Sequence, residues 1–337
     1  MRKFFGALLC GMLIAAMIPA AAFATGAETA NPTVTVAGGE PVEIENNNFQ
    51  DTLNGLDAAG KDVTVNIPEG TTLYCRYHNN AVVYIPKNFK SITFTGKGTL
   101  KVTELGNLPL YMNGVPAVIN DITLADSIVA GSGDGTEVSS TNLTLNNVKQ
   151  RGSVSVFGGS GSNNRGAVGK VQSSKVVVNG SSSIHQVYGG SNGKGIVENS
   201  YVEINGGDMT YIFGGGNGST TTDNTNVVFN GGETDYITGG SHSAYTKNAK
   251  VTINSGATVN VNVFGAGIHT ATADNTEVVM NGGTVKNSIY GAGMTATMTG
   301  DTHITIKGGT VVKAVYGGGY ILPSVLPSIR LSKHIFP

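Results

Sequence analysis

The stretch Asn281-Gly-Gly-Thr-Val-Lys-Asn-Ser-Ile-Tyr-Gly-Ala-Gly293 recurs in varied form along most of the chain. Most copies begin with Asn and Gly and end with a β-branched aliphatic residue, a mostly aromatic residue, and Gly followed by Gly or Ala. The residues just before these Gly pairs are 157, 188, 213, 238, 264, 290 and 316, which gives steps of 31, 25, 25, 26, 26 and 26 residues. A period of this length predicts a solenoid, in which each repeat packs against its neighbours.

Two apolar positions alternate with a variable one in the segment that precedes each Asn. This period-2 pattern predicts a strand whose apolar positions face a core. The first of these positions holds Val176, Val202, Val227, Val251, Val278 and Ile304, and the second holds Val178, Ile204, Phe229, Ile253, Met280 and Ile306. With a second strand in each repeat, we expect an all-β protein, a right-handed parallel β-helix of roughly ten coils.

The Asn that follows each first strand occupies the same place in successive repeats. Stacked coils lie about 4.8 Å apart, so each Asn amide can bond the amides above and below while the next Gly supplies the positive φ of a tight corner. A polar ligand-binding row is the alternative interpretation. The predicted structural ladder consists of Asn179, Asn205, Asn230, Asn254 and Asn281.

A column of aromatic residues follows the aliphatic position at the end of the second strand. Strict alternation points these rings outward, as a flat platform for stacking on sugar rings, whereas a bend at the Gly pair turns them inward. In the second case the rings form a structural stack over the glycines, and the interruption at Thr238 favours it. The candidate binding residues are Phe157, Tyr188, Phe213, Phe264, Tyr290 and Tyr316.

The N-terminal part of the repeat region carries a second signature. Residues 48–60 have apolar side chains on one helical face, with Asn48 as the expected cap and Gly60 as the expected end. Then follow Asp62-Val-Thr-Val-Asn-Ile-Pro-Glu-Gly-Thr71 and Ile92-Thr-Phe-Thr-Gly-Lys-Gly-Thr-Leu100. This order over residues 48–102 resembles the entrance of parallel β-helix proteins of the pectin-lyase-like superfamily. The resemblance implies a helix that plugs the open end of the coil, and it implies a fold without an activity.

The ends of the chain differ from the repeats. Residues 1–24 have a charged start, a short apolar core and a small-x-small site, which predict a secretory signal, and residues 25–47 predict a tether or first edge strand. We expect the β-helix to span residues 48–320. Residues 321–337 have no repeat pattern, so we expect an irregular tail, with a truncated or frame-shifted end as a hypothesis. Because Cys75 is the one cysteine after the signal, no intrachain disulfide is expected.

Composition and motifs give little support for catalysis or cofactors. The formal net charge is −1 and 13% of residues are charged, so no nucleic-acid partner is expected. Asp208 and Asp235 fall on neighbouring repeats at different offsets, which makes a weak carboxylate dyad. His242 and His269 can approach each other, but a two-histidine set without a third ligand predicts no metal site. We therefore expect no catalytic residues, no metal and no cofactor.

Three functions remain open at this point. We expect a secreted or cell-surface, adhesin-like bacterial repeat protein that is monomeric and has no membrane span after signal cleavage. It would bind a polysaccharide, or a host or neighbouring cell surface, through a rigid face. The alternatives are a polysaccharide lyase or glycoside hydrolase, and a passive stalk of a larger surface protein.

Overall fold

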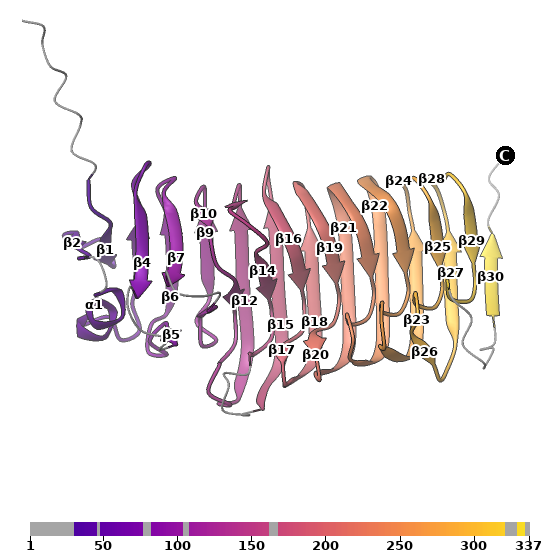
Figure 1. Ribbon diagram of the computed structural model, residues 1–337, viewed down its shortest axis with the longest axis horizontal. Coiled ribbons are helices and arrows are strands. Elements are labelled where there is room, and N and C mark those ends of the chain that lie inside the picture. The colour runs from indigo at the N-terminus through magenta and orange to yellow at the C-terminus, as the bar shows by residue number, and fades with distance from the viewer. Residues whose placement is uncertain are drawn as a thin grey trace, which may run out of the picture.

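The chain forms a right-handed parallel β-helix of about nine turns, which confirms the predicted all-β class with slightly fewer coils than expected (Figure 1). The computed structural model describes residues 30–45, 48–76, 82–103, 108–161, 168–320 and 329–333. The predicted signal at residues 1–24 lies outside the described residues. The coils follow one another along the long axis of the molecule in sequence order.

The N-terminal end carries a short helix and two antiparallel strands. Strand β1 (Thr33–Val36) pairs antiparallel with β2 (Val42–Glu43) and with β3 (Asp62–Asn66). Helix α1 (Phe49–Gly55) buries Phe49 and Leu53, and the Phe49 ring lies 6.3 Å from that of Phe94. The helix therefore covers the apolar interior of the first coil.

Helix α1 is shorter than the sequence predicts. It ends at Gly55, because Leu56 already has an extended backbone with ψ of 135°. Asn48 lies at the cap position but makes no side-chain capping bond. Gly60, the predicted end, lies in the following turn with φ of 67°. The amphipathic pattern thus located the helix correctly but overstated its length.

Each coil has three strand segments, one on each of three faces. The first face consists of β3, β6 (Ser91–Thr95), β9 (Ala117–Asn120), β12 (Val138–Asn146), β15 (Gly169–Asn179), β18 (Gly195–Ile204), the first parts of β21 (Thr221–Thr238) and β22 (Tyr245–Phe264), β23 (Thr272–Met280), β27 (Thr302–Ile306) and β30 (Ile329–Lys333). All pairs from β3 onward are parallel and in register, as the repeat predicts. Strand β30 lies within the tail that the sequence predicts to be irregular.

The second and third faces are separate strands in the early coils and join later. The second face begins with β4 (Thr72–Arg76), β7 (Thr99–Thr103), β10 (Thr123–Leu124) and β13 (Lys149–Gln150), and the third with β5 (Val83–Tyr84), β8 (Leu110–Tyr111), β11 (Ile128–Val129) and β14 (Ser155–Phe157). Strands β16 (Ser183–Tyr188) and β19 (Asp208–Phe213) and the second parts of β21 and β22 run across both faces. The last coils use β24 (Thr284–Val285), β25 (Ser288–Tyr290), β28 (Thr310–Val311) and β29 (Ala314–Tyr316), while β17 (Asn192–Gly193), β20 (Asn217–Gly218) and β26 (Thr297–Met298) lie on the return path.

The joined strands bend between the two faces. Met209 and Ile212 in β19 are both fully buried in the main core although they are three residues apart. A straight strand cannot face both into the core, since its side chains alternate. The bend therefore leaves Thr210 and Tyr211 together on the outside.

Two kinds of hydrogen bond tie neighbouring parts of the coils together. The first is the Asn ladder, in which Asn179, Asn205, Asn230, Asn254 and Asn281 each donate an amide N–H to the Asn of the preceding coil over 2.6–2.9 Å. The second links the start of a first strand to the Gly pair of the same coil. Its hydroxyl donors lie 2.5–2.7 Å from the carbonyl of the first Gly, and they are Thr141, Ser174, Ser200, Thr225, Thr276 and Thr302.

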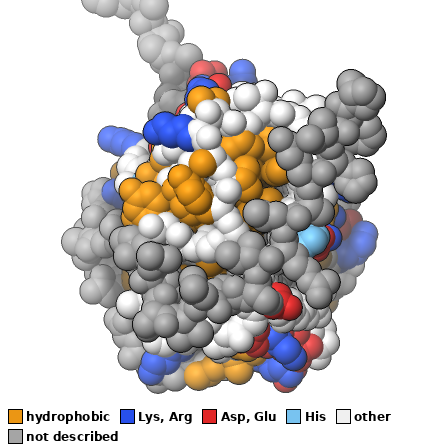
Figure 2. Space-filling view, turned by 90° about the vertical axis from the view of Figure 1, so that its right-hand side faces the viewer, with side chains coloured by type: hydrophobic (Ala, Val, Ile, Leu, Met, Phe, Trp, Pro, Cys, Tyr) orange, Lys and Arg blue, Asp and Glu red, His pale blue; other side chains and the backbone are white. Residues whose placement is uncertain are grey.

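The last described coil is open on two of its three faces. Strand β30 pairs with β27, but no described strand follows β28 or β29 on the C-terminal side. Hydrophobic side chains gather on this end (Figure 2), and Val312, Tyr316 and Tyr320 are exposed. Tyr316, whose equivalents Phe264 and Tyr290 are buried in the preceding coils, is therefore uncovered at this end.

The first Gly of each pair allows the coils to approach closely. A Cβ atom on Gly239 would overlap the backbone carbonyl oxygen of Gly265 in the next coil. At the neighbouring Gly240 the nearest atom would be 3.2 Å away, and the next two repeats carry Ala266 and Ala292 at that position. The first glycine of the pair is therefore required by the close approach of the next coil, whereas the second position accepts Ala.

We expect Gly239→Ala to lower the thermal unfolding midpoint strongly, because the overlapping atom is backbone and cannot rotate away. Gly240→Ala is the matched control and should change the midpoint little. Circular dichroism melts of both variants measure the midpoints. We expect the free energy of unfolding of Gly239→Ala to be lower than that of Gly240→Ala by about 2 kcal/mol or more. Equal midpoints for the two variants would show that close coil approach does not constrain the first Gly.

Candidate functional site

The predicted aromatic column lies in register along the third face, with Val129 and Thr238 as non-aromatic members. Its register runs through Tyr84, Tyr111, Val129, Phe157, Tyr188, Phe213, Thr238, Phe264, Tyr290 and Tyr316. Two stacked pairs lie before Thr238 and two after it, with ring centres 4.5–5.2 Å apart and planes within 19°. The rings therefore stack at the spacing of the coils.

Most of this column is buried. Phe157, Tyr188, Phe213, Phe264 and Tyr290 are at most 8% exposed, whereas Tyr316 in the last coil is 48% exposed. Because both faces of an inner ring are covered by its neighbours, these five rings offer no free face to a sugar. The structure thus has the geometry of the stack, and the platform interpretation does not fit these positions.

From Thr238 onward, the residue four positions after each member of the column packs over the stack. Ile268 and Met294 pack against the ring cluster. His242 meets Phe213 edge-on at 5.4 Å, and Tyr320 meets Tyr290 edge-on at 5.5 Å. The chain folds back after the Gly pair and so places these side chains over rings that point away from the main core.

Two rings of the column lie in early coils where the repeat is hard to see. Tyr84 and Tyr111 have ring centres 5.4 Å apart. Tyr111 is buried in the same cluster as the rings of the later coils, and Tyr84 packs against that cluster. A Cβ atom on Gly133 or Gly161 would collide with the Tyr111 ring, which explains glycine at both positions. Sequence reasoning missed them because the step from residue 111 to 129 is only 18 residues, so the 26-residue period does not apply.

Aromatic side chains reach solvent beside the buried column. Tyr211 and Tyr236 are half-buried and stack with ring centres 5.1 Å apart and planes 8° apart. Tyr211 also lies 5.8 Å from the ring of Phe213, and His185 meets it edge-on at 6.0 Å. The bend in β19 and β21 places these tyrosines outside, one residue before Ile212 and Ile237. These tyrosines were not identified from the sequence, because other repeats have a different residue at this position.

Three carboxylates share this surface. Asp208 pairs in register with Glu233, and Asp235 follows two residues later. Asp208 and Glu233 are exposed, and neither they nor Asp235 form a salt bridge within the described part of the chain. Asp208 and Asp235 lie on neighbouring coils, as the sequence indicates, but β21 places Glu233 opposite Asp208. We call Asp208, Tyr211, Glu233, Asp235 and Tyr236 the outer tyrosine face.

The outer tyrosine face can bind hydroxyl groups but lacks the setting of an acid catalyst. Exposed carboxylates accept hydrogen bonds from sugar hydroxyls, and tyrosine provides an apolar ring with a polar tip. A general acid needs an apolar pocket that raises its pKa. Asp235 instead accepts from the Asn260 amide at 3.4 Å, and the Lys286 ammonium donates to Asn260 at 2.8 Å.

His242 and His269 lie together, although their offsets in the repeat differ by one residue. Their ring centres are 4.5 Å apart and their planes are tilted by 55°. Burial, and secondarily the neighbouring His269, lower the pKa of His242. Within the described residues no group of three or more His, Cys, Asp and Glu side chains is placed to share a metal ion. Cys75 is buried, and burial raises the pKa of its thiol.

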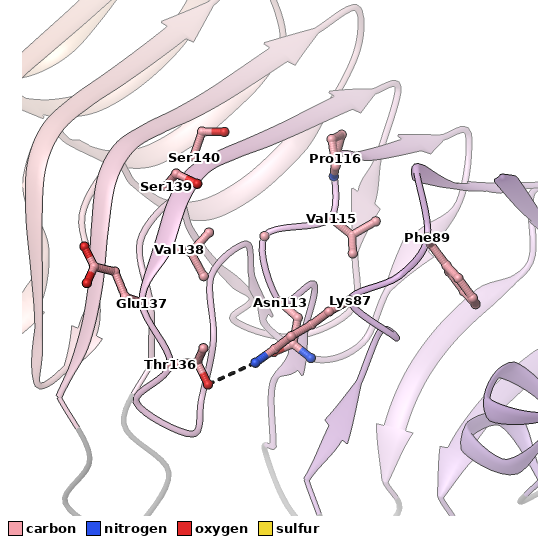
Figure 3. A pocket seen from close by; sticks show the side chains of 11 residues that line it. Lys87, Phe89, Asn113, Val115, Pro116, Thr136, Glu137, Val138, Ser139 and Ser140 are labelled. Carbon is pink, nitrogen blue, oxygen red and sulfur yellow. Dashed lines mark hydrogen bonds between the residues drawn. The ribbon is translucent and has the colours of Figure 1, made fainter. Parts of the chain in front are cut away.

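A hollow of about 280 Å³ lies between the early coils (Figure 3). The Lys87 ammonium donates to the Thr136 hydroxyl at 2.9 Å and lies 3.6 Å from the Asp134 carboxylate. Asn113 contributes a buried amide oxygen without a hydrogen-bond partner in the described part of the chain. The internal ion pair occupies the cation that would otherwise bind a ligand, so this hollow is a weaker candidate than the outer tyrosine face.

Comparisons with known proteins give no relative for this chain. No protein-family model matches it, and no match was found among curated proteins or solved structures. In the described part of the chain, no helix has the length and apolar character needed to cross a membrane.

We expect Tyr290→Ala to destabilise the protein by about 3 kcal/mol, because it removes a ring packed between Phe264 and Tyr316. Tyr236→Ala removes a half-buried ring and should cost clearly less. Thermal melts of both variants against the parent chain test this ranking. A Tyr290→Ala protein that melts like the parent would contradict a structural role for the column.

Proposed function

We propose that this chain is a secreted or cell-surface, adhesin-like repeat protein that binds glycan through the outer tyrosine face. The observation that carries the proposal is the half-exposed Tyr211–Tyr236 pair beside Asp208, Glu233 and Asp235. We further propose that the coil belongs to the pectin-lyase-like kind of β-helix, on the basis of its entrance signature and capping helix.

The chemistry of this face suits a polyhydroxylated ligand. The face combines two phenol rings with three carboxylates, all carried by the paired segments of β19 and β21 on adjacent coils. Sugars offer both C–H faces and hydroxyl donors, so they can contact both kinds of group. The carboxylates favour neutral or amine-bearing glycans over uronate polymers, since like charges in close contact repel.

Rigidity of the backing strands supports binding. Tyr211 lies beside the buried ring of Phe213, and both flanking residues in β19 and β21, Ile212 and Ile237, are fully buried. Side chains held by a packed strand lose little conformational freedom when a ligand arrives. The face is therefore preformed, and a sugar can bind it without first ordering the side chains.

The enzymatic alternative keeps one supporting observation. Asp208 and Glu233 are direct register partners on adjacent coils, so their carboxylates start from backbones one coil apart. Their exposure argues for solvated acceptors instead of an acid–base pair. The stalk alternative has no specific side-chain arrangement in its favour.

A glycan array followed by titration calorimetry tests the proposal. We expect Tyr211→Ala and Tyr236→Ala to weaken binding on the order of tenfold each while the fold persists. Tyr201→Ala is the matched control, because Tyr201 is a partly exposed tyrosine on the first face, where Lys175 lies over its ring.

Two results would count against glycan binding at this face: an array without any bound glycan, and equal loss of affinity in Tyr201→Ala. Release of reducing ends or unsaturated products from a bound polysaccharide, abolished by Asp208→Asn and Glu233→Gln, would instead overturn the non-enzymatic role and favour the enzymatic alternative.

A further inference from the structure

The His242–His269 contact is a feature that the glycan proposal does not use. The two rings come from the turns that follow β21 and β22, at the fourth residue after Thr238 and the fifth after Phe264. The repeat places Ile268 and Met294 at the fourth position of the next two coils, where they cover the ring stack. The two imidazoles are therefore a departure from the repeat.

The distance between the rings suits a shared ion. With metal–nitrogen distances of about 2.1 Å, two imidazoles that bind one ion have ring centres roughly 4.6–5.3 Å apart. The observed distance is 4.5 Å, close to the lower end of this range, and the 55° tilt excludes a parallel stack in which the ring faces cover each other.

Both rings are held from outside the pair. His242 packs edge-on against Phe213, and its Nδ1 lies 3.3 Å from the Ser243 hydroxyl, which leaves Nε2 available. His269 has a positive φ of 57°, and the Thr295 hydroxyl donates to its carbonyl oxygen at 2.5 Å. Such a backbone is uncommon outside glycine and persists where neighbouring contacts hold it.

We propose that His242 and His269 form a two-histidine site for one divalent transition-metal ion of the class that imidazole prefers, namely Cu²⁺, Ni²⁺ or Zn²⁺. Neutral imidazole nitrogens are ligands for these ions, with Cu²⁺ expected to bind most tightly. Water fills the remaining coordination positions on the solvent side, where His269 is exposed. The site is open and exchangeable.

The test uses Ni²⁺ titration by calorimetry on the full chain without a histidine tag. We expect one ion per chain at this pair, and His269→Asn should weaken its binding on the order of tenfold or more. Asn tolerates the positive φ at this exposed position, so the variant should fold. His303→Gln is the matched control and should bind as the parent does, because His303 bonds Thr305 on the first face.

The melting midpoint in Ni²⁺ gives a second readout. It should rise for the parent and for His303→Gln but not for His269→Asn. His242→Gln should also lose Ni²⁺ binding. If His242→Gln does not fold, the test is decided by His269→Asn. Parent-like affinity in His269→Asn, or no Ni²⁺ binding by the parent, would overturn the proposal.

Discussion

Adjacent coils lie one hydrogen-bond spacing apart, and at the first Gly of each Gly pair this leaves no space for a side chain. The first Gly of each pair lies against the carbonyl of the corresponding Gly in the next coil. The same carbonyls accept hydroxyl protons from Thr225, Thr276 and their equivalents in most coils. Close approach therefore fixes the backbone at the Gly pair, where the third face ends and the chain turns back to the first face. The positions of the ring column, of the residues that cover it and of the return turn all depend on the backbone at this Gly pair.

Stacking identical coils also decides which side chains can serve a ligand. A ring that repeats in every coil covers the next ring, so a regular column is buried except at its ends. Phe213 follows this rule with 0% exposure, while Tyr316 at the open end is exposed. Side chains available for recognition must then lie beside the column, as Tyr211 and Tyr236 do. Regularity stabilises the solenoid, and accessible chemistry depends on departures from it.

The sequence predicted those parts of the structure that repeat. The inward strand positions, the Asn amides and the coil period follow from spacing alone, because each coil repeats the same contacts. The orientation of the rings did not follow, since alternation assumes a straight strand and β19 bends between Met209 and Ile212. Tyr84 and Tyr111 were missed because the early coils have irregular lengths. The pairing of Asp208 with Glu233 also did not follow, since offsets of residue numbers do not show how two strands pair.

The departures from the repeat gather in one part of the solenoid. Thr238 replaces a ring of the column, and Ala249 replaces the hydroxyl donor of its coil. Tyr236 and His242 lie in the same two coils, and His269 follows in the next turn. A sequence that keeps its repeat for stability and changes it locally carries a cost there, which selection tolerates where the changed residues have a use. The coils around Thr238 carry both proposed sites, the outer tyrosine face and the histidine pair.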